Sequence, residues 1–292
     1  MSFKSIFITG SNGFVGKQII ELNSHLKFKK YKRTNKIIIN EPYVFHFAGL
    51  AHNSHKSNKR DEYINANYIL TKKIFNAFKK SQSTKFFIFL STSKVSGLKN
   101  NILVEHVTNN NRNIYSESKL MAEKFLLNEI KNIGNKKIYI IRPSIIIGKN
   151  MKGNLNYIKK IVKYNLIWPF GKFDNKISIL DIRNLNYVLL SIINNKISSG
   201  IYNLSNSNPI KVTELVIKIN YIMNKKTKIF FFNRSAIKLI FTLGNFFNLP
   251  FLNLETFRKI TENNIVSNKK IIDSIGQLPF DNDDGLKLYF NE

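Results

Sequence analysis

The 292-residue chain contains no cysteine. Disulfide bonds, thiolate metal ligands and thiolate nucleophiles are therefore excluded, and the composition suits a reducing cytoplasm. No stretch provides the roughly 18–20 uninterrupted apolar residues that a membrane-spanning helix requires. The N-terminus shows no charged segment followed by a long apolar run and a cleavage site, so we expect no signal peptide and a cytoplasmic location.

Acidic residues are scarce, because 18 Asp and Glu stand against 46 Lys and Arg and leave a formal net charge of +28. Such a field attracts nucleic acid, anionic lipid and phosphorylated substrates. The lysines, however, are scattered among Asn, Ile and Phe, with no separate basic run and no nucleic-acid-binding motif. We therefore expect a solvated basic surface and no specific nucleic-acid partner.

The most apolar segment runs from Ala236 to Leu254 and is interrupted by Lys238, Asn245, Asn248 and Pro250. We expect it to be a helical packing surface in the second half of the chain. The alternative is an interfacial amphipathic segment that gives weak peripheral membrane association.

Short apolar runs alternate with amphipathic helical stretches in the first half of the chain, which predicts strand–helix–strand units and a parallel sheet. The predicted strands are Ser5–Thr9, Phe28–Lys32, Tyr43–Ala48, Lys85–Ser91 and Lys137–Arg142. The predicted helices are Val15–Leu26, Asp61–Lys80 and Ser116–Ile133. Two later segments, Ile177–Leu190 and Gly200–Leu204, are expected to return to the sheet.

Three glycines follow the first predicted strand and open a helix: Gly10, Gly13 and Gly16, in the segment TGSNGFVG. This arrangement offers a turn with positive φ, a backbone without Cβ beside a pyrophosphate, and close packing of helix on strand. The helix N-terminus adds free N–H groups and a positive partial charge. The motif predicts a Rossmann-type, doubly wound parallel sheet that binds a dinucleotide. The other residues of the turn predicted to bind the cofactor are Asn12, Phe14 and Val15.

The expected fold is therefore α/β with two parts. Residues 1–148 are expected to form the dinucleotide-binding domain, with residues 177–204 returning to its sheet. Residues 149–176 and 205–292 are expected to form a smaller, mixed substrate-binding domain.

A tyrosine and a lysine begin a predicted helix in Tyr115-Ser-Glu-Ser-Lys119. Their spacing of four places both on one face, one turn apart. A nearby ammonium favours phenolate and is expected to lower the pKa of the tyrosine, which makes Tyr115 a candidate general acid/base for a sugar hydroxyl. Thr92, in STSKVSG, follows a predicted strand at the edge where open α/β sheets bind ligands, and its hydroxyl is a candidate hydrogen-bond partner of the reacting oxygen.

The order and placement of these three motifs resemble the extended short-chain dehydrogenase/reductase superfamily, and within it the nucleotide-sugar epimerases, dehydratases and 4-keto-reductases. The resemblance covers nearly the whole chain. HFAGLAH (residues 46–52) is similar to the family's His-x-Ala-Ala segment, and NYILT (67–71) to its Asn-x-x-Gly-Thr. IRPSIIIG (141–148) is similar to the segment that passes the nicotinamide. The resemblance implies cofactor contacts from Phe47, Ala48, Gly49, Asn67, Arg142, Pro143 and Ser144.

The resemblance further implies that Thr92, Tyr115 and Lys119 form the catalytic triad, with Lys119 also binding the nicotinamide ribose. Ser93, Lys94 and Asn154 are then expected on the substrate side, together with Thr92 and Tyr115. Because Ile177 stands where the family often has an arginine on the sugar diphosphate, Lys176 or Arg183 is expected to replace it.

The adenosine side departs from the family pattern. Only 29 residues separate Gly16 from His46, which is short for a strand–helix–strand passage. Lys32 and Arg33 stand where an acidic ribose ligand is expected, which favours NADPH over NADH. The five histidines show no metal-site spacing, so no metal is expected, and His46 is expected to pack at a strand end.

These features predict an NAD(P)-dependent enzyme acting at C4 of a UDP-sugar, with reduction of a UDP-4-keto-sugar favoured over 4-epimerisation. A 4,6-dehydratase is less favoured, because Ser93 and Lys94 follow Thr92 where an Asp-Glu pair is usual. A non-catalytic NAD(P)-binding protein and a basic protein that binds nucleic acid or membrane stay open as alternatives. So does a homodimer.

Overall fold

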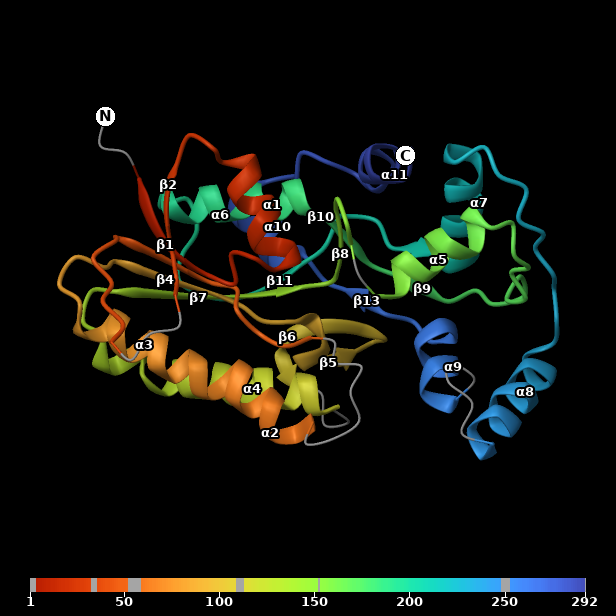
Figure 1. Ribbon diagram of the computed structural model, residues 1–292, viewed down its shortest axis with the longest axis horizontal. Helices are drawn as coiled ribbons and strands as arrows, with labels where there is room; N and C mark the ends of the chain where they lie inside the picture. Colours follow the sequence, from red (N-terminus) through yellow and green to blue (C-terminus); the bar gives the residue numbers. More distant parts are fainter. Residues whose placement is uncertain are drawn as a thin grey trace.

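The computed structural model describes residues 4–32, 36–51, 59–108, 113–151, 153–247 and 253–291. At its centre lies a parallel sheet of six strands in the order β11-β7-β4-β3-β1-β2 (Figure 1). Neighbouring strands pair in parallel throughout this sheet. The strands are β1 (Ser5–Thr9), β2 (Lys27–Lys30), β3 (Tyr43–His46), β4 (Phe86–Leu90), β7 (Lys137–Pro143) and β11 (Gly200–Leu204).

Helices cover both faces of this sheet, because successive strand residues point to opposite sides and are apolar on both. One face packs against α1 (Phe14–Leu22), α6 (Ile182–Ile193) and α10 (Lys269–Ile275), which lie above the sheet in Figure 1. The other packs against α3 (Leu70–Lys80) and α4 (Ile114–Asn128), which lie below it. The expected doubly wound α/β fold is therefore confirmed.

A second hydrophobic core lies beside the sheet, in the part drawn at the right of Figure 1. Its helices are α5 (Asn154–Lys163), α7 (Val212–Ile222), α8 (Arg234–Phe246), α9 (Leu254–Thr261) and α11 (Asn282–Phe290). Short strands connect it to the sheet: β8 (Ile145–Ile147) with β10 (Ile179–Asp181), and β9 (Lys176–Ile177) with β12 (Ile210–Lys211). A further sheet contains β5 (Ser96–Lys99), β6 (Ile102–Thr108) and β13 (Ile265–Val266).

Two segments differ from their sequence-based prediction. The stretch predicted as one helix over Asp61–Lys80 is α2 (Lys59–Tyr63), a π-helical turn (Ile64–Ile69) and α3. Of the segment 177–204, only β11 joins the six-stranded sheet. The residues after Asp181 form α6 instead, because the Asp181 side chain accepts a hydrogen bond from the Arg183 amide and caps this helix. The stretch Ile177–Leu190 is thus two short strands and most of a helix.

β2 forms one edge of the sheet, and it is the only strand among the described residues between α1 and β3. None of the four residues of β2 is buried, whereas all five residues of β4 are. None of the described helices is long and apolar enough to cross a bilayer.

Candidate active site

The glycine turn between β1 and α1 is packed too tightly for any side chain. Gly10 has a φ of +72°, and a Cβ there would lie 2.6 Å from the Ala48 amide nitrogen. A Cβ at Gly16 would collide with the carbonyl oxygen of Gly10. Gly13 is the N-cap of α1 and provides no side chain to satisfy the first amides of the helix, which also lacks an acidic residue in its first turn. These free N–H groups suit a bound pyrophosphate.

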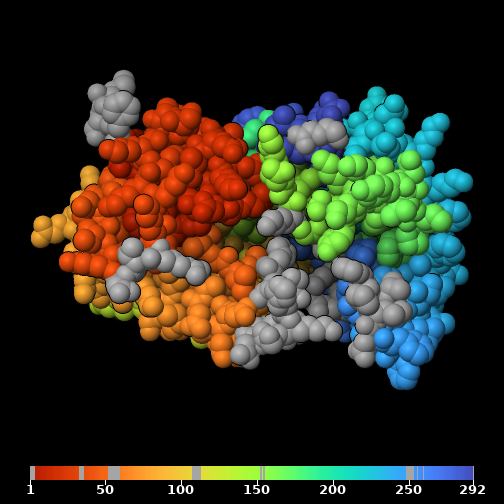
Figure 2. Space-filling view, in the orientation of Figure 1, coloured from red at the N-terminus to blue at the C-terminus, as the bar shows by residue number. Residues whose placement is uncertain are grey.

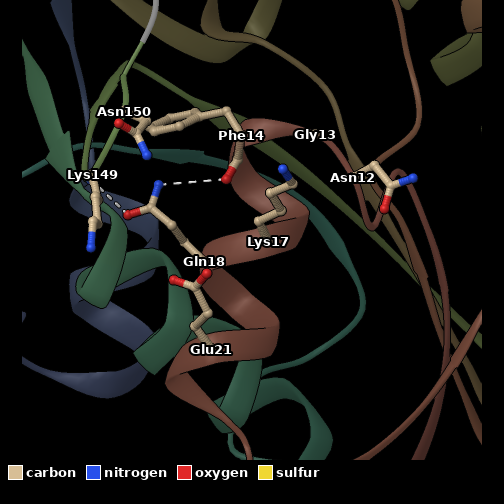
Figure 3. A pocket seen from close by; sticks show the side chains of 8 residues that line it. All are labelled: Asn12, Gly13, Phe14, Lys17, Gln18, Glu21, Lys149 and Asn150. Atoms are coloured by element: carbon tan, nitrogen blue, oxygen red, sulfur yellow. Dashed lines mark hydrogen bonds between the residues drawn. The ribbon is translucent and has the colours of Figure 1, made fainter.

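A cavity of about 380 Å³ lies beside this turn (Figure 3). It is lined by Asn12, Gly13 and Phe14 of the turn, by Lys17, Gln18 and Glu21 of α1, and by Lys149 and Asn150. Gln18 accepts a hydrogen bond of 2.8 Å from the Lys149 amide and so ties α1 to the end of β8. The cavity contains none of the three predicted catalytic residues and lies on the outer side of the glycine turn.

A chain of hydrogen bonds fixes the ends of β1 and β3. His46 lies between the Thr9 hydroxyl, 2.7 Å from Nδ1, and the Thr71 hydroxyl, 2.8 Å from Nε2. Burial, and secondarily the charge of Lys119, lowers the pKa of His46 to about 3. The imidazole is therefore neutral and serves packing, as expected from the sequence.

Asn67, in the π-helical turn, clamps the loop that follows β3. Its Oδ1 accepts from the Leu50 amide at 2.7 Å, and its Nδ2 donates to Leu50 O at 3.0 Å and to Ser118 Oγ at 2.8 Å. A Cβ at Gly49 would lie 2.7 Å from Asn67 Oδ1 and 3.0 Å from Lys119 Nζ. Gly49 thus lies against Lys119 with no room for an added side chain, while Ala48 lies against Gly10 and Phe47 packs on Phe45. Short π-helical turns often mark functional sites.

The structure brings Thr92, Tyr115 and Lys119 together. Thr92 follows β4 and is hydrogen-bonded to Tyr115, which lies in the first turn of α4, and Lys119 follows one turn later. Asn113 caps this helix by accepting from the Ser116 amide at 3.0 Å. Two predicted substrate residues flank the triad: Ser93 is buried in the single turn after Thr92, and Lys94 Nζ lies 5.9 Å from the centroid of the Tyr115 ring.

The electrostatics of the triad differ from the expectation that Lys119 lowers the pKa of Tyr115. Burial raises that pKa to about 12, and the hydrogen bond from Thr92 opposes it only in part. Lys119 instead donates to the Leu90 carbonyl at 2.8 Å and lies 4.6 Å from the centroid of Phe89. Burial lowers the pKa of Lys119 to about 8, against the attraction of Glu123. Tyr115 is therefore protonated and Lys119 mostly charged at neutral pH.

A buried ion pair lies beneath the triad and was not predicted. Glu123, one turn beyond Lys119, accepts from Arg142 Nε at 3.0 Å and from Nη2 at 2.5 Å, and also from the Ser91 hydroxyl. Arg142 Nη1 donates to Ser96 Oγ at 3.2 Å and to Glu105 O at 3.0 Å. The guanidinium predicted to bind the cofactor is thus engaged inside the protein. No local pattern in the sequence signals this pair, because Glu123 and Arg142 lie nineteen residues apart.

Other predicted residues lie around this centre. Pro143 ends β7, and the buried Ser144 Oγ has no hydrogen-bond partner among the described residues, as a ligand contact would require. Val15 packs on the core, and Lys32 is exposed beyond β2. Arg33 lies outside the described residues, as does the side chain of Asn154, the first residue of α5.

The two cations expected on the sugar diphosphate lie apart from the triad. Lys176 is exposed in β9. Arg183 pairs with Asp181 through Nε at 3.0 Å and Nη2 at 2.6 Å, and its guanidinium lies 3.8 Å from the Phe280 ring centroid. The described residues contain no group of three His, Asp or Glu side chains able to hold a metal ion.

Comparisons with known proteins agree with this geometry. UDP-glucose 4-epimerase of Vibrio cholerae is 27% identical over 257 residues, which cover 77% of each chain. UDP-N-acetylglucosamine 4-epimerase of Methanobrevibacter ruminantium, solved with UDP-N-acetylmuramic acid, is 16% identical with a TM-score of 0.78. dTDP-4-dehydrorhamnose reductase of Bacillus anthracis, solved with NADP, is 20% identical with a TM-score of 0.73. Both structures align over 99% of this chain and 98% of their own. The model of the NAD dependent epimerase/dehydratase family matches residues 25–205, more than half of the chain, and the protein therefore belongs to this family.

Proposed function

We propose that the protein is an NADPH-dependent reductase of a 4-keto nucleotide sugar. The observation that carries the proposal is the placement of Tyr115, in the first turn of α4 and within hydrogen-bonding reach of Thr92 after β4. Burial there raises the pKa of the phenol to about 12. Reduction of a ketone needs a proton donor at the oxygen, whereas oxidation of a hydroxyl needs a base in the same place. The protonated phenol matches the first requirement.

The chain's residues fit a dinucleotide. The glycine turn and the open amides of α1 suit a pyrophosphate, and the missing Cβ at Gly49 lets the backbone lie against Lys119. The buried Ser144 Oγ has no hydrogen-bond partner among the described residues and is available to a ligand. When bound, NADPH supplies the hydride that reaches C4 of the sugar. Tyr115 gives its proton to the C4 oxygen, so that the ketone becomes an alcohol, and solvent later returns a proton to the phenolate.

The remaining triad residues support that proton transfer. Thr92 hydrogen-bonds the same oxygen and orients the Tyr115 hydroxyl. The Lys119 ammonium stabilises the phenolate once the proton has left, and it can also hold the ribose beside Gly49. The Lys94 ammonium, which lies over the Tyr115 ring, is placed to bind an oxygen of the sugar.

A nucleotide sugar is the substrate class that the relatives support, because the names of all three contain one. The division of the chain is proposed as predicted, with residues 1–148 and 177–204 for the cofactor and residues 149–176 and 205–292 for the sugar nucleotide. The separate second core supports it. In this arrangement Asn154, Lys176 and Arg183 belong to the substrate side.

NADPH is proposed over NADH because the C-terminal end of β2 carries cations. Lys30 and Lys32 are exposed there, and residues 27–32 include no carboxylate to repel a 2′-phosphate. The reductase from Bacillus anthracis was solved with NADP, which supports the same choice.

A UDP-sugar 4-epimerase is the second candidate, and the name of the Vibrio cholerae relative favours it. An epimerase must hold one cofactor through oxidation, rotation of the keto sugar and reduction. Because β2 is an exposed, cationic edge strand, it offers the adenosine of the cofactor fewer contacts than a buried strand would. Weaker binding suits a reductase, whose cofactor enters reduced and leaves oxidised in each cycle.

A single set of assays separates the two. The purified protein is incubated with UDP-4-keto-sugars and either NADPH or NADH, and loss of nicotinamide absorbance is followed. In parallel, UDP-glucose and UDP-N-acetylglucosamine are incubated without added cofactor. A reductase consumes NADPH in proportion to product. Protein that purifies with NAD bound and equilibrates the UDP-sugar pairs would overturn the proposal in favour of the epimerase.

A further inference from the structure

Helix α8 has two apolar stripes, and only one of them is buried. Ile237, Phe241 and Gly244 face the second core, where the Phe241 ring lies 5.6 Å from that of Phe257 in α9. The other stripe is solvent-exposed and occupies a different face of the helix, because its members fall between the buried positions in the helical repeat. Its residues, here called the α8 stripe, are Leu239, Ile240, Leu243, Phe246 and Phe247.

This exposure is large for apolar side chains. Leu243 is 50% exposed and Phe246 77% exposed. Figure 1 shows α8 with α9 at the far end of the molecule, away from the six-stranded sheet, so that the α8 stripe lies remote from the triad. Exposed apolar surface gathered on one helix is typical of a docking surface.

The charge around the α8 stripe has one sign. Residues 221–247 contain no Asp or Glu and contain five cations: Lys225, Lys226, Lys228, Arg234 and Lys238, all of them exposed. The segment just before α8 adds three exposed aromatic residues, Phe230, Phe231 and Phe232. Figure 2 shows this part of the surface, in light blue, along the right-hand side of the molecule. The partner of such a surface must therefore offer both an apolar phase and negative charge.

We propose that the α8 stripe and its cations dock the protein on an anionic lipid bilayer. With 13 residues, α8 is about 20 Å long, too short to span a bilayer and suited to lie in the plane of its interface. There the aliphatic and aromatic side chains enter the acyl boundary while the net positive charge of residues 221–247 attracts the lipid phosphates. In a symmetric contact between two copies of the chain, the five cations of one copy would repel the five of the other. Nucleic acid offers negative charge but no apolar phase for Leu239, Ile240 and Leu243.

The test uses the full chain and sedimentation with vesicles of phosphatidylcholine alone or mixed with an equal part of phosphatidylglycerol. The wild type is expected to bind the mixed vesicles and to bind the neutral ones at least about tenfold more weakly, since electrostatic attraction adds to apolar burial. The double variant Leu243→Ser/Phe246→Ser is expected to lose about tenfold or more of the binding to mixed vesicles, because two large apolar side chains no longer leave water.

The matched control is Leu288→Ser/Ile38→Ser, which removes two apolar side chains exposed to the same degree, 52% each, outside α8. It should bind like the wild type, and both double variants should keep the wild-type melting temperature. The proposal is overturned if the wild type does not bind mixed vesicles. It is also overturned if both double variants bind equally, which would assign binding to net charge alone. Loss of a dimer in Leu243→Ser/Phe246→Ser without any vesicle binding would assign the stripe to a protein interface instead. None of these outcomes depends on which reaction the triad performs.

Discussion

The two strands that frame the cofactor site are built differently. β4 leads to Thr92, lies in the middle of the sheet and is buried along its whole length. β2 leads to Lys32, forms the edge of the sheet and has no buried residue. Packing therefore fixes the proposed catalytic end, whereas the proposed adenosine end depends on a few exposed side chains. Mutations should separate the two: changes beside β4 should alter rate or stability, and changes at the end of β2 should alter cofactor choice alone.

The largest effect is expected from Tyr115→Phe, which keeps the ring and removes the proton donor. The rate should fall by about two to four orders of magnitude while cofactor affinity stays nearly unchanged. Steady-state assays together with cofactor titration measure both quantities. Tyr63→Phe is the control, because the Tyr63 ring lies 6.3 Å from that of Tyr115 and should be dispensable for proton transfer. Near-native turnover of Tyr115→Phe would refute the role of this residue.

The second-largest effect concerns the stability that the buried ion pair of Glu123 and Arg142 provides. Glu123→Ala leaves the buried Arg142 guanidinium without its carboxylate, and the free energy of unfolding should fall by about 3–5 kcal/mol. Denaturant titration measures this loss. Glu129→Ala is the control at the C-cap of the same helix, because the Glu129–Lys79 pair is partly exposed and its removal should barely move the midpoint. Equal denaturation midpoints for the two variants would show that the buried ion pair does not stabilise the fold.

A smaller effect is expected at the edge strand. Lys32→Glu should weaken NADPH binding by roughly ten- to a hundredfold, the loss of one charge-assisted contact of about 1.5–3 kcal/mol, and should spare NADH. Calorimetric titration with both cofactors measures the difference. Lys27→Glu, at the opposite end of β2, makes the same change of charge and should leave the preference intact. If both variants weaken NADPH binding equally, the cofactor preference depends on the overall charge of the protein and not on the position of Lys32.

The smallest effect is a pH dependence. The Lys119 ammonium is present below its pKa of about 8 and is lost above it, so the rate should fall about tenfold per pH unit as pH rises beyond 8. Tyr115, with a pKa of about 12, stays protonated across this range. A pH–rate profile from 7 to 10 tests the effect, and Lys119→Arg should move the fall to higher pH. A flat wild-type profile would show that the ammonium is not required.

Sequence patterns predicted the sheet, and the helical face that Tyr115 and Lys119 share, because both depend on local signals. Apolar runs located β1, β3, β4 and β7, and the spacing of Tyr115 and Lys119 placed them on one helical face. The raised pKa of Tyr115 could not be predicted, because it results from burial among residues distant in sequence. The same holds for the Glu123–Arg142 pair, which joins α4 to β7. The π-turn at Asn67 was not predicted either, because the apolar residues of Asp61–Lys80 lie close to regular helical spacing.

Strand β2 has a consequence for how molecules of this protein behave toward one another. An edge strand exposes unpaired backbone amides and carbonyls, which can recruit a strand of another molecule and start aggregation. Here the edge is four residues long, and three of them are lysines: Lys27, Lys29 and Lys30. Two approaching edges would therefore repel before their backbones could pair. The lysine-rich strand at the proposed adenosine end of the site thus also prevents a strand of another molecule from extending the sheet.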